Sequence, residues 1–313
     1  MEHFVTLFDS LFLPQGLALY FSMQRNLNKF TLWIICVDDL SHSILSGLNL
    51  PNMRLLNLSE IETETLKKLK EERTKGEYCW TLTPFVPKFV FDADNSVEQV
   101  TYLDADVWFR KNPRLIFKEF SKSEKSVLIT DHAFAPEYDK STLAGQYCVQ
   151  FMTFRRGSSE IVRSWWQDRC VEWCFNRHED GKFGDQKYLD DWPVRFADEV
   201  HVLFNKELIL APWNATRFPY GNSIVWHFHE LRIMRRFNRW QVFLCGYRLP
   251  PVVIQNIYEP YLKDLTKAID LLVSTGFAVQ AQKTIGHFSF IRNILSSLRS
   301  IIFSSAPKQI ISL

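Results

Sequence analysis

The sequence lacks the cysteine patterns that mark secreted or zinc-binding domains. Its cysteines are Cys36, Cys79, Cys148, Cys170, Cys174 and Cys245, and they include no C-x-x-C pair and no regular spacing. This excludes a disulfide framework and indicates a reducing compartment. Cys170 and Cys174 are one helical turn apart, but no second pair completes a zinc site, so two thiols on a helix are the simpler interpretation.

Long apolar runs and strong net charge are also absent. No segment reaches the roughly 20 unbroken apolar residues that a membrane-spanning helix needs, and Met1-Glu2-His3 is not the basic start of a secretory signal. The formal net charge is only +2, which excludes bulk attraction to nucleic acid. We therefore expect a cytoplasmic protein with no nucleic-acid partner.

Glycine-rich phosphate loops are missing too, although the chain has the material for an α/β domain. Neither G-x-G-x-x-G nor G-x-x-x-x-G-K-[ST] follows the first predicted strand, so neither a dinucleotide site nor a P-loop is expected. At 313 residues and 46% hydrophobic composition, the chain can bury a large core. Residues 4–8 and 30–37 are predicted strands, with a helix at residues 16–23 between them. The second strand is a nearly continuous apolar run, typical of a buried parallel strand.

The remaining pattern extends this alternation. Further strands are predicted at residues 127–130 and 147–154, with helices over residues 57–75 and 161–175. Thr83-Pro84 predicts another helix start, with threonine as the N-cap and proline in the first turn. We expect a mixed, mostly parallel sheet flanked by helices in residues 1–245, followed by a helical extension over residues 246–313.

One predicted strand carries two carboxylates where it stops being apolar. Asp104 and Asp106 follow residues 100–103, and both can turn toward one hard cation because the chain leaves the strict strand alternation there. An acidic turn that closes a strand fits the spacing equally well. Asp92-Ala93-Asp94 has the same spacing, but it follows a helical pattern and runs into a polar turn. The apolar Val107-Trp108-Phe109 behind Asp106 favours the second copy as the metal site.

Two further segments carry candidate functional side chains. Asp185 stands at a predicted helix start, where it either caps the helix or, with Gln186, faces a substrate. His227 and His229 lie on one face if residues 225–230 are extended. A lone buried histidine is usually structural, whereas an extended His-x-His in a chain with a carboxylate pair is a better ligand candidate.

In this order, the motifs resemble glycosyltransferases of the GT-A fold, in the family 8 group related to glycogenin and bacterial lipopolysaccharide galactosyltransferases. The matching segments, which span most of residues 1–230, are Val5–Ser10, Tyr102–Asp106, Gly184–Gln186, Ala211–Asn214 and Trp226–Phe228. The resemblance implies a Rossmann-like sheet and an enzyme that transfers a sugar from a nucleotide diphosphate-sugar donor, most often a UDP-sugar. The acceptor would be a hydroxyl group of a glycan, a polysaccharide or a lipid-linked molecule.

The resemblance also implies roles for individual residues. Asp104, Asp106 and His227 would bind Mn²⁺ or Mg²⁺, and the ion would neutralise the diphosphate leaving group. Asp185 and Gln186 would be the catalytic residues at the sugar, and their match implies retention of configuration. The donor would be bound by Thr6, Leu7, Asp9, Asp39, Lys88, Asp104, Gln150 and Asn214, of which the first four would line the base and ribose.

Two positions depart from the family pattern. Pro84 stands where related enzymes carry Lys or Arg, so a basic contact to the donor is either missing or made by Lys88 one turn later. The glycine and the Lys-Pro-Trp expected after the histidine are absent as well. Four arginines at helical spacing could replace that charge, or face a membrane or solvent: Arg232, Arg235, Arg236 and Arg239.

The tail from residue 281 onward contains no Asp or Glu. Its apolar residues recur at the helix period at Phe288, Ile291, Leu295, Leu298 and Ile302, and its charges are Lys283, Arg292, Arg299 and Lys308. The pattern predicts an amphipathic helix on an anionic membrane or a helix docked on this domain or another subunit. The first alternative implies peripheral contact with the inner face of the membrane and a lipid-linked acceptor.

Two other functions fit part of the pattern. A phosphohydrolase of the haloacid dehalogenase type also has D-x-D after an apolar strand, with the first aspartate as nucleophile. Here, however, Val107-Trp108 follow the motif, which lies far from the N-terminus. A non-catalytic module that binds a nucleotide sugar would explain Pro84, although both carboxylates and a third ligand remain. The sugar, the base, the acceptor and the oligomeric state stay open.

Overall fold

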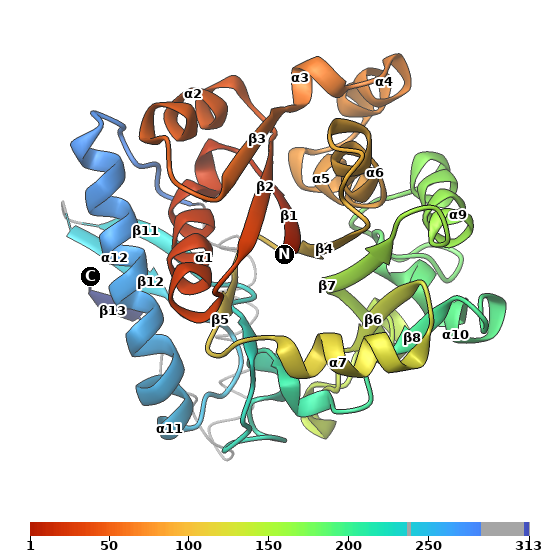
Figure 1. Ribbon diagram of the computed structural model, residues 1–313. Coiled ribbons are helices and arrows are strands. Elements are labelled where there is room, and N and C mark those ends of the chain that lie inside the picture. Colours follow the sequence, from red (N-terminus) through yellow and green to blue (C-terminus); the bar gives the residue numbers. More distant parts are fainter. Residues whose placement is uncertain (237–238, 283–309, 313) are drawn as a thin grey trace.

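A seven-stranded sheet forms the centre of the computed structural model, which describes residues 1–236, 239–282 and 310–312 (Figure 1). The strand order is β3-β2-β1-β4-β7-β6-β8. Strands β3, β2, β1 and β4 are parallel to one another, whereas β7 is antiparallel to both β4 and β6. The strands are β1 (Glu2–Phe8), β2 (Phe30–Cys36), β3 (Met53–Asn57), β4 (Gln99–Leu103), β6 (Val127–Asp131), β7 (Tyr147–Arg155) and β8 (Val200–Val202).

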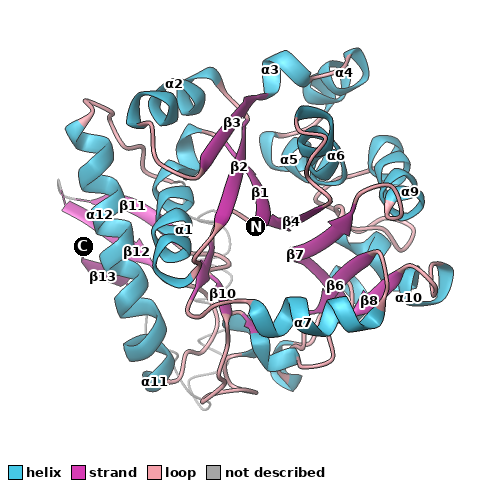
Figure 2. Ribbon diagram, viewed as in Figure 1, coloured by secondary structure: helices cyan, strands magenta, loops and turns pink. Residues whose placement is uncertain are grey.

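Helices cover both faces of this sheet (Figure 2). Phe4 of β1 packs in a hydrophobic cluster with α1, α7 and α12, whereas its neighbour Val5 packs with α4, α5, α6 and α9 on the other face. Burial on both faces explains why β1 and β2 are nearly continuous apolar runs. The helices are α1 (Leu13–Asn26), α2 (Asp39–Leu48), α3 (Leu58–Ile61), α4 (Glu64–Glu72), α5 (Lys75–Leu82), α6 (Val86–Ala93), α7 (Arg114–Ser123), α8 (Ser141–Ala144), α9 (Glu160–Glu172), α10 (Trp192–Arg195), α11 (Pro251–Val253) and α12 (Glu259–Ser274).

Two small sheets complete the described structure. Strands β5 (Val107–Phe109), β10 (Val225–His227) and β9 (Ile209–Leu210) form the first, in which β5 and β10 are antiparallel. Strands β11 (Arg232–Arg236), β12 (Arg239–Phe243) and β13 (Ile310–Ser312) form the second, which is antiparallel throughout. The apolar run over residues 100–109 is therefore two strands in two different sheets, with Asp104–Asp106 between them.

Two local predictions are wrong. The arginines at residues 232–239 do not lie on a helix but on the β11-β12 hairpin, where Ile233 opposite Val242 is buried and strand alternation decides the structure. Thr83 does not start a helix, because α5 leads through a 3₁₀ turn over Thr83–Phe85 directly into α6. Its hydroxyl donates to the carbonyl of Cys79 inside this run, so no free helix start exists for it to cap.

The described part of residues 246–313 is mostly helical and packs on the sheet domain. A π-helical turn over Ile254–Tyr258 joins α11 to α12, and α12 shares the hydrophobic cluster of α1. Asp264 of α12 accepts from Arg25 Nη1 (2.8 Å) and from Trp108 Nε1 (2.7 Å). The predicted amphipathic tail lies mainly in residues 283–309, outside the described residues. None of the described helices has the length and apolar character to cross a membrane.

Candidate active site

The Asp104–Asp106 turn joins β4 of the large sheet to β5 of the small β5-β10-β9 sheet. The backbone N–H of Asp104 donates to Gln150 O on β7 (3.2 Å), and the carbonyl of Asp106 accepts from Phe228 N after β10 (2.8 Å). His227 pairs with Val107 in the antiparallel register of β10 and β5. Two carboxylates and an imidazole from distant parts of the chain therefore meet at one sheet edge.

These three side chains have the geometry of a metal site. His227 Nε2 lies 3.1 Å from Asp106 Oδ1 and 3.7 Å from Asp104 Oδ2. One ligand atom from each residue lies within 4.8 Å of the others. Carboxylate oxygens with one imidazole nitrogen fit Mn²⁺ or Mg²⁺. A site with only three protein ligands leaves positions open for the oxygens of a substrate.

Neighbouring side chains orient the triad. The Tyr102 hydroxyl donates to Asp104 Oδ1 (2.9 Å), and Gln150 Oε1 lies 2.8 Å from His227 Nδ1. The Trp213 ring meets the His227 ring edge-on, with 5.4 Å between their centroids. His229 lies beside His227, at 5.7 Å between ring centroids, but its Nε2 is 3.8 Å from Glu230 Oε1 and it is not part of the triad.

Charges within the triad balance each other. Burial and the charge of Asp106 raise the pKa of Asp104, against the opposing effect of His227. Burial would raise the pKa of Asp106 as well, but the His227 charge outweighs it and lowers that pKa. Burial opposes protonation of His227, yet the two carboxylates raise its pKa well above 6.5. Without a cation, a proton on His227 therefore offsets the negative charge of the aspartates.

Asp185 lies beside this cluster with a free carboxyl oxygen. It precedes the 3₁₀ helix Gln186–Asp191, but its side chain forms no cap hydrogen bond there, so the predicted capping role is wrong. The residue is 3% exposed, and its Oδ2 has no hydrogen-bond partner. Burial and the nearby charge of Asp104 raise the pKa of Asp185 to about 8. The Gln186 amide donates to the carbonyl of Ala144 (2.8 Å), which ties it to the end of α8.

The residues predicted to line the base and ribose lie at the carboxyl ends of the first two strands. Thr6 and Leu7 are buried on β1, and the Thr6 hydroxyl has no partner. Asp9 accepts from Leu11 N (3.0 Å) and pairs with Lys75 Nζ (2.8 Å). Asp39 begins α2 and accepts from Asn57 Nδ2 (3.0 Å). This edge is where nucleotides bind in open α/β sheets.

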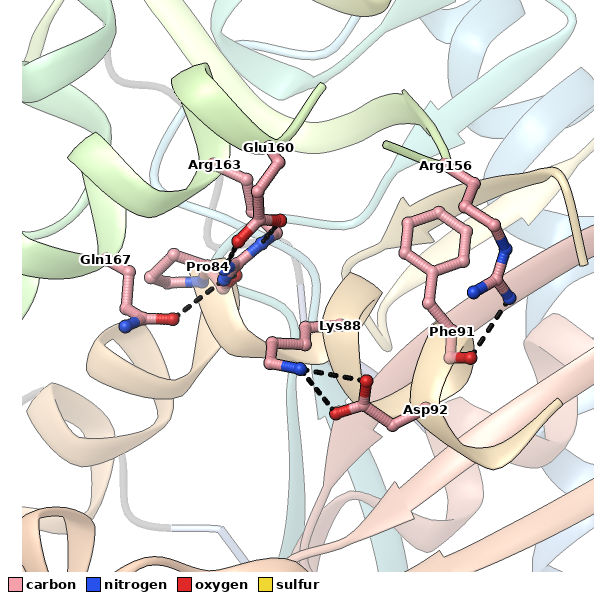
Figure 3. Close-up of polar contacts among 8 residues, drawn as sticks. All are labelled: Pro84, Lys88, Phe91, Asp92, Arg156, Glu160, Arg163 and Gln167. Atoms are coloured by element: carbon pink, nitrogen blue, oxygen red, sulfur yellow. Dashed lines mark hydrogen bonds and ion pairs between the residues drawn. The ribbon is translucent and has the colours of Figure 1, made fainter. Parts of the chain in front are cut away.

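Lys88 and Asn214 make local contacts. Lys88 Nζ lies 2.8 and 2.7 Å from the two carboxyl oxygens of Asp92, one turn along α6 (Figure 3). Near Pro84 the cation is instead Arg163 of α9, which donates to the Pro84 carbonyl at 3.0 Å. Asn214 is fully buried and joins two loops through hydrogen bonds to Ala211 N and His132 O. None of these hydrogen bonds and ion pairs of Lys88 and Asn214 reaches Asp104, Asp106 or His227.

Sequence reasoning missed several residues around the site. Tyr102 was detectable, because it precedes Asp104 by two residues and so shares its face in an extended chain. Lys75 carried no local signal, since its partner Asp9 is far away in the chain. Burial would raise the pKa of Cys148, but His132 and His227 outweigh it and lower the pKa to about 7. No sequence motif around Cys148 indicated that its thiol lies near these histidines.

Comparison with known sequences identifies two relatives from Bacillus subtilis (strain 168), while no protein-family model matches the chain. The uncharacterized protein YfnF is 33% identical over 274 residues, which cover 84% of this chain and 88% of YfnF. The uncharacterized protein YfnD is 27% identical over 294 residues, with coverage of 87% and 91%. The similarity to both extends over nearly the whole length of each protein.

Solved structures with a similar fold include glycosyltransferases. The galactosyltransferase LgtC, in complex with donor and acceptor sugar analogues, superposes with a TM-score of 0.53 at 12% identity, covering 85% of this chain and 95% of LgtC. GlyE of Streptococcus pneumoniae TIGR4 has a TM-score of 0.51 at 13% identity, covering 91% of this chain and 67% of GlyE. These likenesses confirm the predicted fold class. The chain therefore belongs to the same protein family as YfnF and has the GT-A fold.

Proposed function

We propose that this protein is a metal-dependent glycosyltransferase that moves a sugar from a nucleotide diphosphate-sugar to a hydroxyl acceptor. The observation that carries the proposal is the triad of Asp104, Asp106 and His227 at the carboxyl edge of a GT-A sheet. A UDP-sugar is the proposed donor, a glycan, polysaccharide or lipid-linked molecule the acceptor, and retention the stereochemical course. The sequence resemblance supports these finer points.

The triad would hold Mn²⁺ or Mg²⁺. When bound, the ion supplies positive charge for the diphosphate that leaves the sugar. His227 would give up its Nε2 proton so that this nitrogen can bind the ion, and the two carboxylates would supply the remaining protein ligands. Arg232 stands close enough that its charge lowers the pKa of Asp106. This supports Arg232 as a phosphate-binding replacement for the missing Lys-Pro-Trp.

Donor binding would extend from the triad along the sheet edge. We propose that Thr6, Leu7, Asp9 and Asp39 line the base and ribose, with Gln150 and Asn214 supporting the sugar end. Lys75 joins this group, because its amine already contacts Asp9 and its side chain is 66% exposed. Lys88 would reach the donor only by leaving Asp92.

Asp185 and Gln186 are the proposed catalytic residues. A carboxyl group with pKa about 8 keeps its proton at pH 7 and can donate it in a hydrogen bond, and Asp185 Oδ2 has no other partner. The proposal is therefore that Asp185 binds an oxygen of the donor sugar. Gln186, at the same turn, would stand beside the anomeric carbon, as the family resemblance implies.

Thermal-shift titration with a panel of nucleotide sugars, with and without Mn²⁺, tests the function directly. A true donor should raise the melting temperature with its concentration, because a ligand that binds only the folded state stabilises it. Metal-dependent release of the nucleoside diphosphate should follow for the same sugar. Binding without any release or transfer would instead identify a non-catalytic module. Hydrolysis of a generic phosphate ester, with no effect of any nucleotide sugar, would revive the phosphohydrolase alternative.

The C-terminal residues carry a separate proposal. Residues 1–245 would form the catalytic domain and residues 246–313 an extension that contacts an anionic membrane through its tail. Vesicle flotation of the full chain and of a chain truncated after Val279 tests this contact. Equal flotation of the two would remove the membrane proposal without affecting the proposed activity.

A further inference from the structure

We propose that Gln150 positions His227 for metal binding, by fixing which of the two ring nitrogens is free to bind the ion. The inference rests on the proposed function, since it concerns the same metal site. It gives Gln150 a different role from contact with the donor sugar. Gln150 would act on the metal through His227 and not as a ligand itself.

The position of Gln150 links both sides of the triad. Its carbonyl accepts from the backbone N–H of Asp104 (3.2 Å), at the point where β4 ends beside β7. Its side chain reaches the other way, so that Oε1 lies 2.8 Å from His227 Nδ1 on β10. The residue is 0% exposed. One buried residue thus contacts the backbone of the first aspartate and the ring of the histidine.

The chemistry of this contact selects the tautomer. An amide oxygen can only accept, so His227 Nδ1 must carry the hydrogen in this bond. A neutral imidazole has one N–H, which leaves the lone pair on Nε2. Nε2 is the atom that lies 3.1 Å from Asp106 and 3.7 Å from Asp104. Metal-binding histidines commonly donate their other N–H to such an oxygen.

A purely structural role explains Gln150 less well. Its Nε2 is buried and has no hydrogen-bond partner, and an unsatisfied buried donor costs about 1–3 kcal/mol. The next two residues on the strand, Phe151 and Met152, are apolar and buried. An apolar side chain like theirs would fill the position of Gln150 without leaving a donor unsatisfied. The contact with His227, in contrast, requires the amide oxygen.

Titration of the full chain with Mn²⁺, followed by electron paramagnetic resonance of the free ion, tests the proposal. Gln150→Leu removes the acceptor and should weaken Mn²⁺ binding about 10- to 100-fold, whereas Gln150→Glu keeps an acceptor and should stay within about threefold of the wild type. Gln15→Leu is the matched control, because Gln15 is also buried, at 1% exposed, and neither end of its amide has a partner. It should bind Mn²⁺ as the wild type does.

A spectroscopic readout separates positioning from general damage. Pulsed resonance at saturating Mn²⁺ should show coupling to a ring nitrogen in the wild type and Gln150→Glu, and lose it in Gln150→Leu. If Gln150→Leu fails to fold, Gln150→Asn is used instead, since its shorter side chain cannot reach Nδ1. Equal affinity and unchanged nitrogen coupling in the folded variant would overturn the inference and leave the proposed function intact. If the wild type binds Mn²⁺ no better than His227→Ala does, the proposed metal site fails as well.

Discussion

The chain contains the tripeptide Asp-Ala-Asp twice, at residues 92–94 and 104–106, and the two copies have different surroundings. Asp92 lies at the end of α6, where its side chain is 59% exposed and pairs with Lys88. Asp94 follows the helix and pairs with Arg54. Asp104 and Asp106 instead lie between two sheets, at 23% and 16% side-chain exposure, with His227 beside them.

The difference shows that spacing does not create a metal site. In the first copy each aspartate finds a lysine or arginine of its own, so its charge is already balanced at the surface. In the second copy two half-buried carboxylates share one buried histidine, and charge is more costly there than at the surface. A divalent cation adds the positive charge that this cluster can still accommodate.

Asp106→Asn should abolish metal function while Asp94→Asn leaves it unchanged. Loss of a residue that only orients a ligand lowers metal affinity about 10- to 100-fold, and loss of the ligand itself should lower it more. We therefore expect a fall on the order of 100-fold or more in Mn²⁺ affinity. Metal-dependent donor turnover should fall with it. Mn²⁺ titration and nucleotide release measure both variants. If the two variants had similar Mn²⁺ affinity and similar donor turnover, the assignment of the metal site to the second copy alone would be wrong.

Metal binding should release a proton from His227. Its pKa is raised well above 6.5, so at pH 7 the proton competes with the ion. Affinity should therefore rise with pH, about tenfold per unit, until the pH reaches the pKa of His227 in the metal-free protein. Titration calorimetry in buffers of different ionisation enthalpy counts the released protons. Release of almost no proton per bound ion at pH 7 would contradict the conclusion that His227 is protonated in the metal-free protein.

Asp185→Asn should stabilise the metal-free protein at high pH. The pKa of Asp185 is about 8 in the folded chain against an ordinary value of 3.8, so between these values the folded chain holds a proton that the unfolded chain releases. The free energy of unfolding therefore falls as pH rises through this window. The gain in the variant should therefore grow by about 1.4 kcal/mol for each pH unit within this window, because one pKa unit corresponds to that free energy.

Urea unfolding at pH 5 and pH 8 measures this gain, which should be much smaller at pH 5. Asp94→Asn is the control from the other copy. Hydrogen bonds from Ser96 lower the pKa of Asp94, so its carboxylate contributes stability above its unfolded pKa, and its removal should bring no gain at pH 8. A pH-independent effect of Asp185→Asn would show that the Asp185 carboxyl is not held protonated by burial.

Lys88→Ala should have the smallest effect. The Lys88–Asp92 pair is exposed on both sides, and such pairs one helical turn apart contribute about 0.3–0.5 kcal/mol. Urea unfolding should show a loss of that size, which 1 M salt removes. Donor affinity should not change. A marked fall in donor affinity would show that Lys88 leaves Asp92 and binds the donor after all.

Local patterns predicted much of the framework correctly. The continuous apolar run of β2 indicated a buried parallel strand, which is confirmed, and the GT-A class that the family resemblance implied is confirmed as well. Errors arose where one residue type fits two structures. Threonine before proline suits a helix start, yet here it lies within a helical run. Arginines three or four apart suit a helix, yet burial of Ile233 and Val242 makes the segment a hairpin.

The sequence by itself determined that Asp104 and Asp106 end a buried strand, because strand propensity and the loss of apolar alternation are local properties. Only the tertiary structure decided which groups surround them. His227 reaches Asp106 because β10 pairs with β5 in one register, and Gln150 reaches His227 because β7 lies beside β4. Lys75 meets Asp9 in the same way, across two elements. These contacts join residues far apart in the chain, and their geometry depends on how whole strands and helices pack.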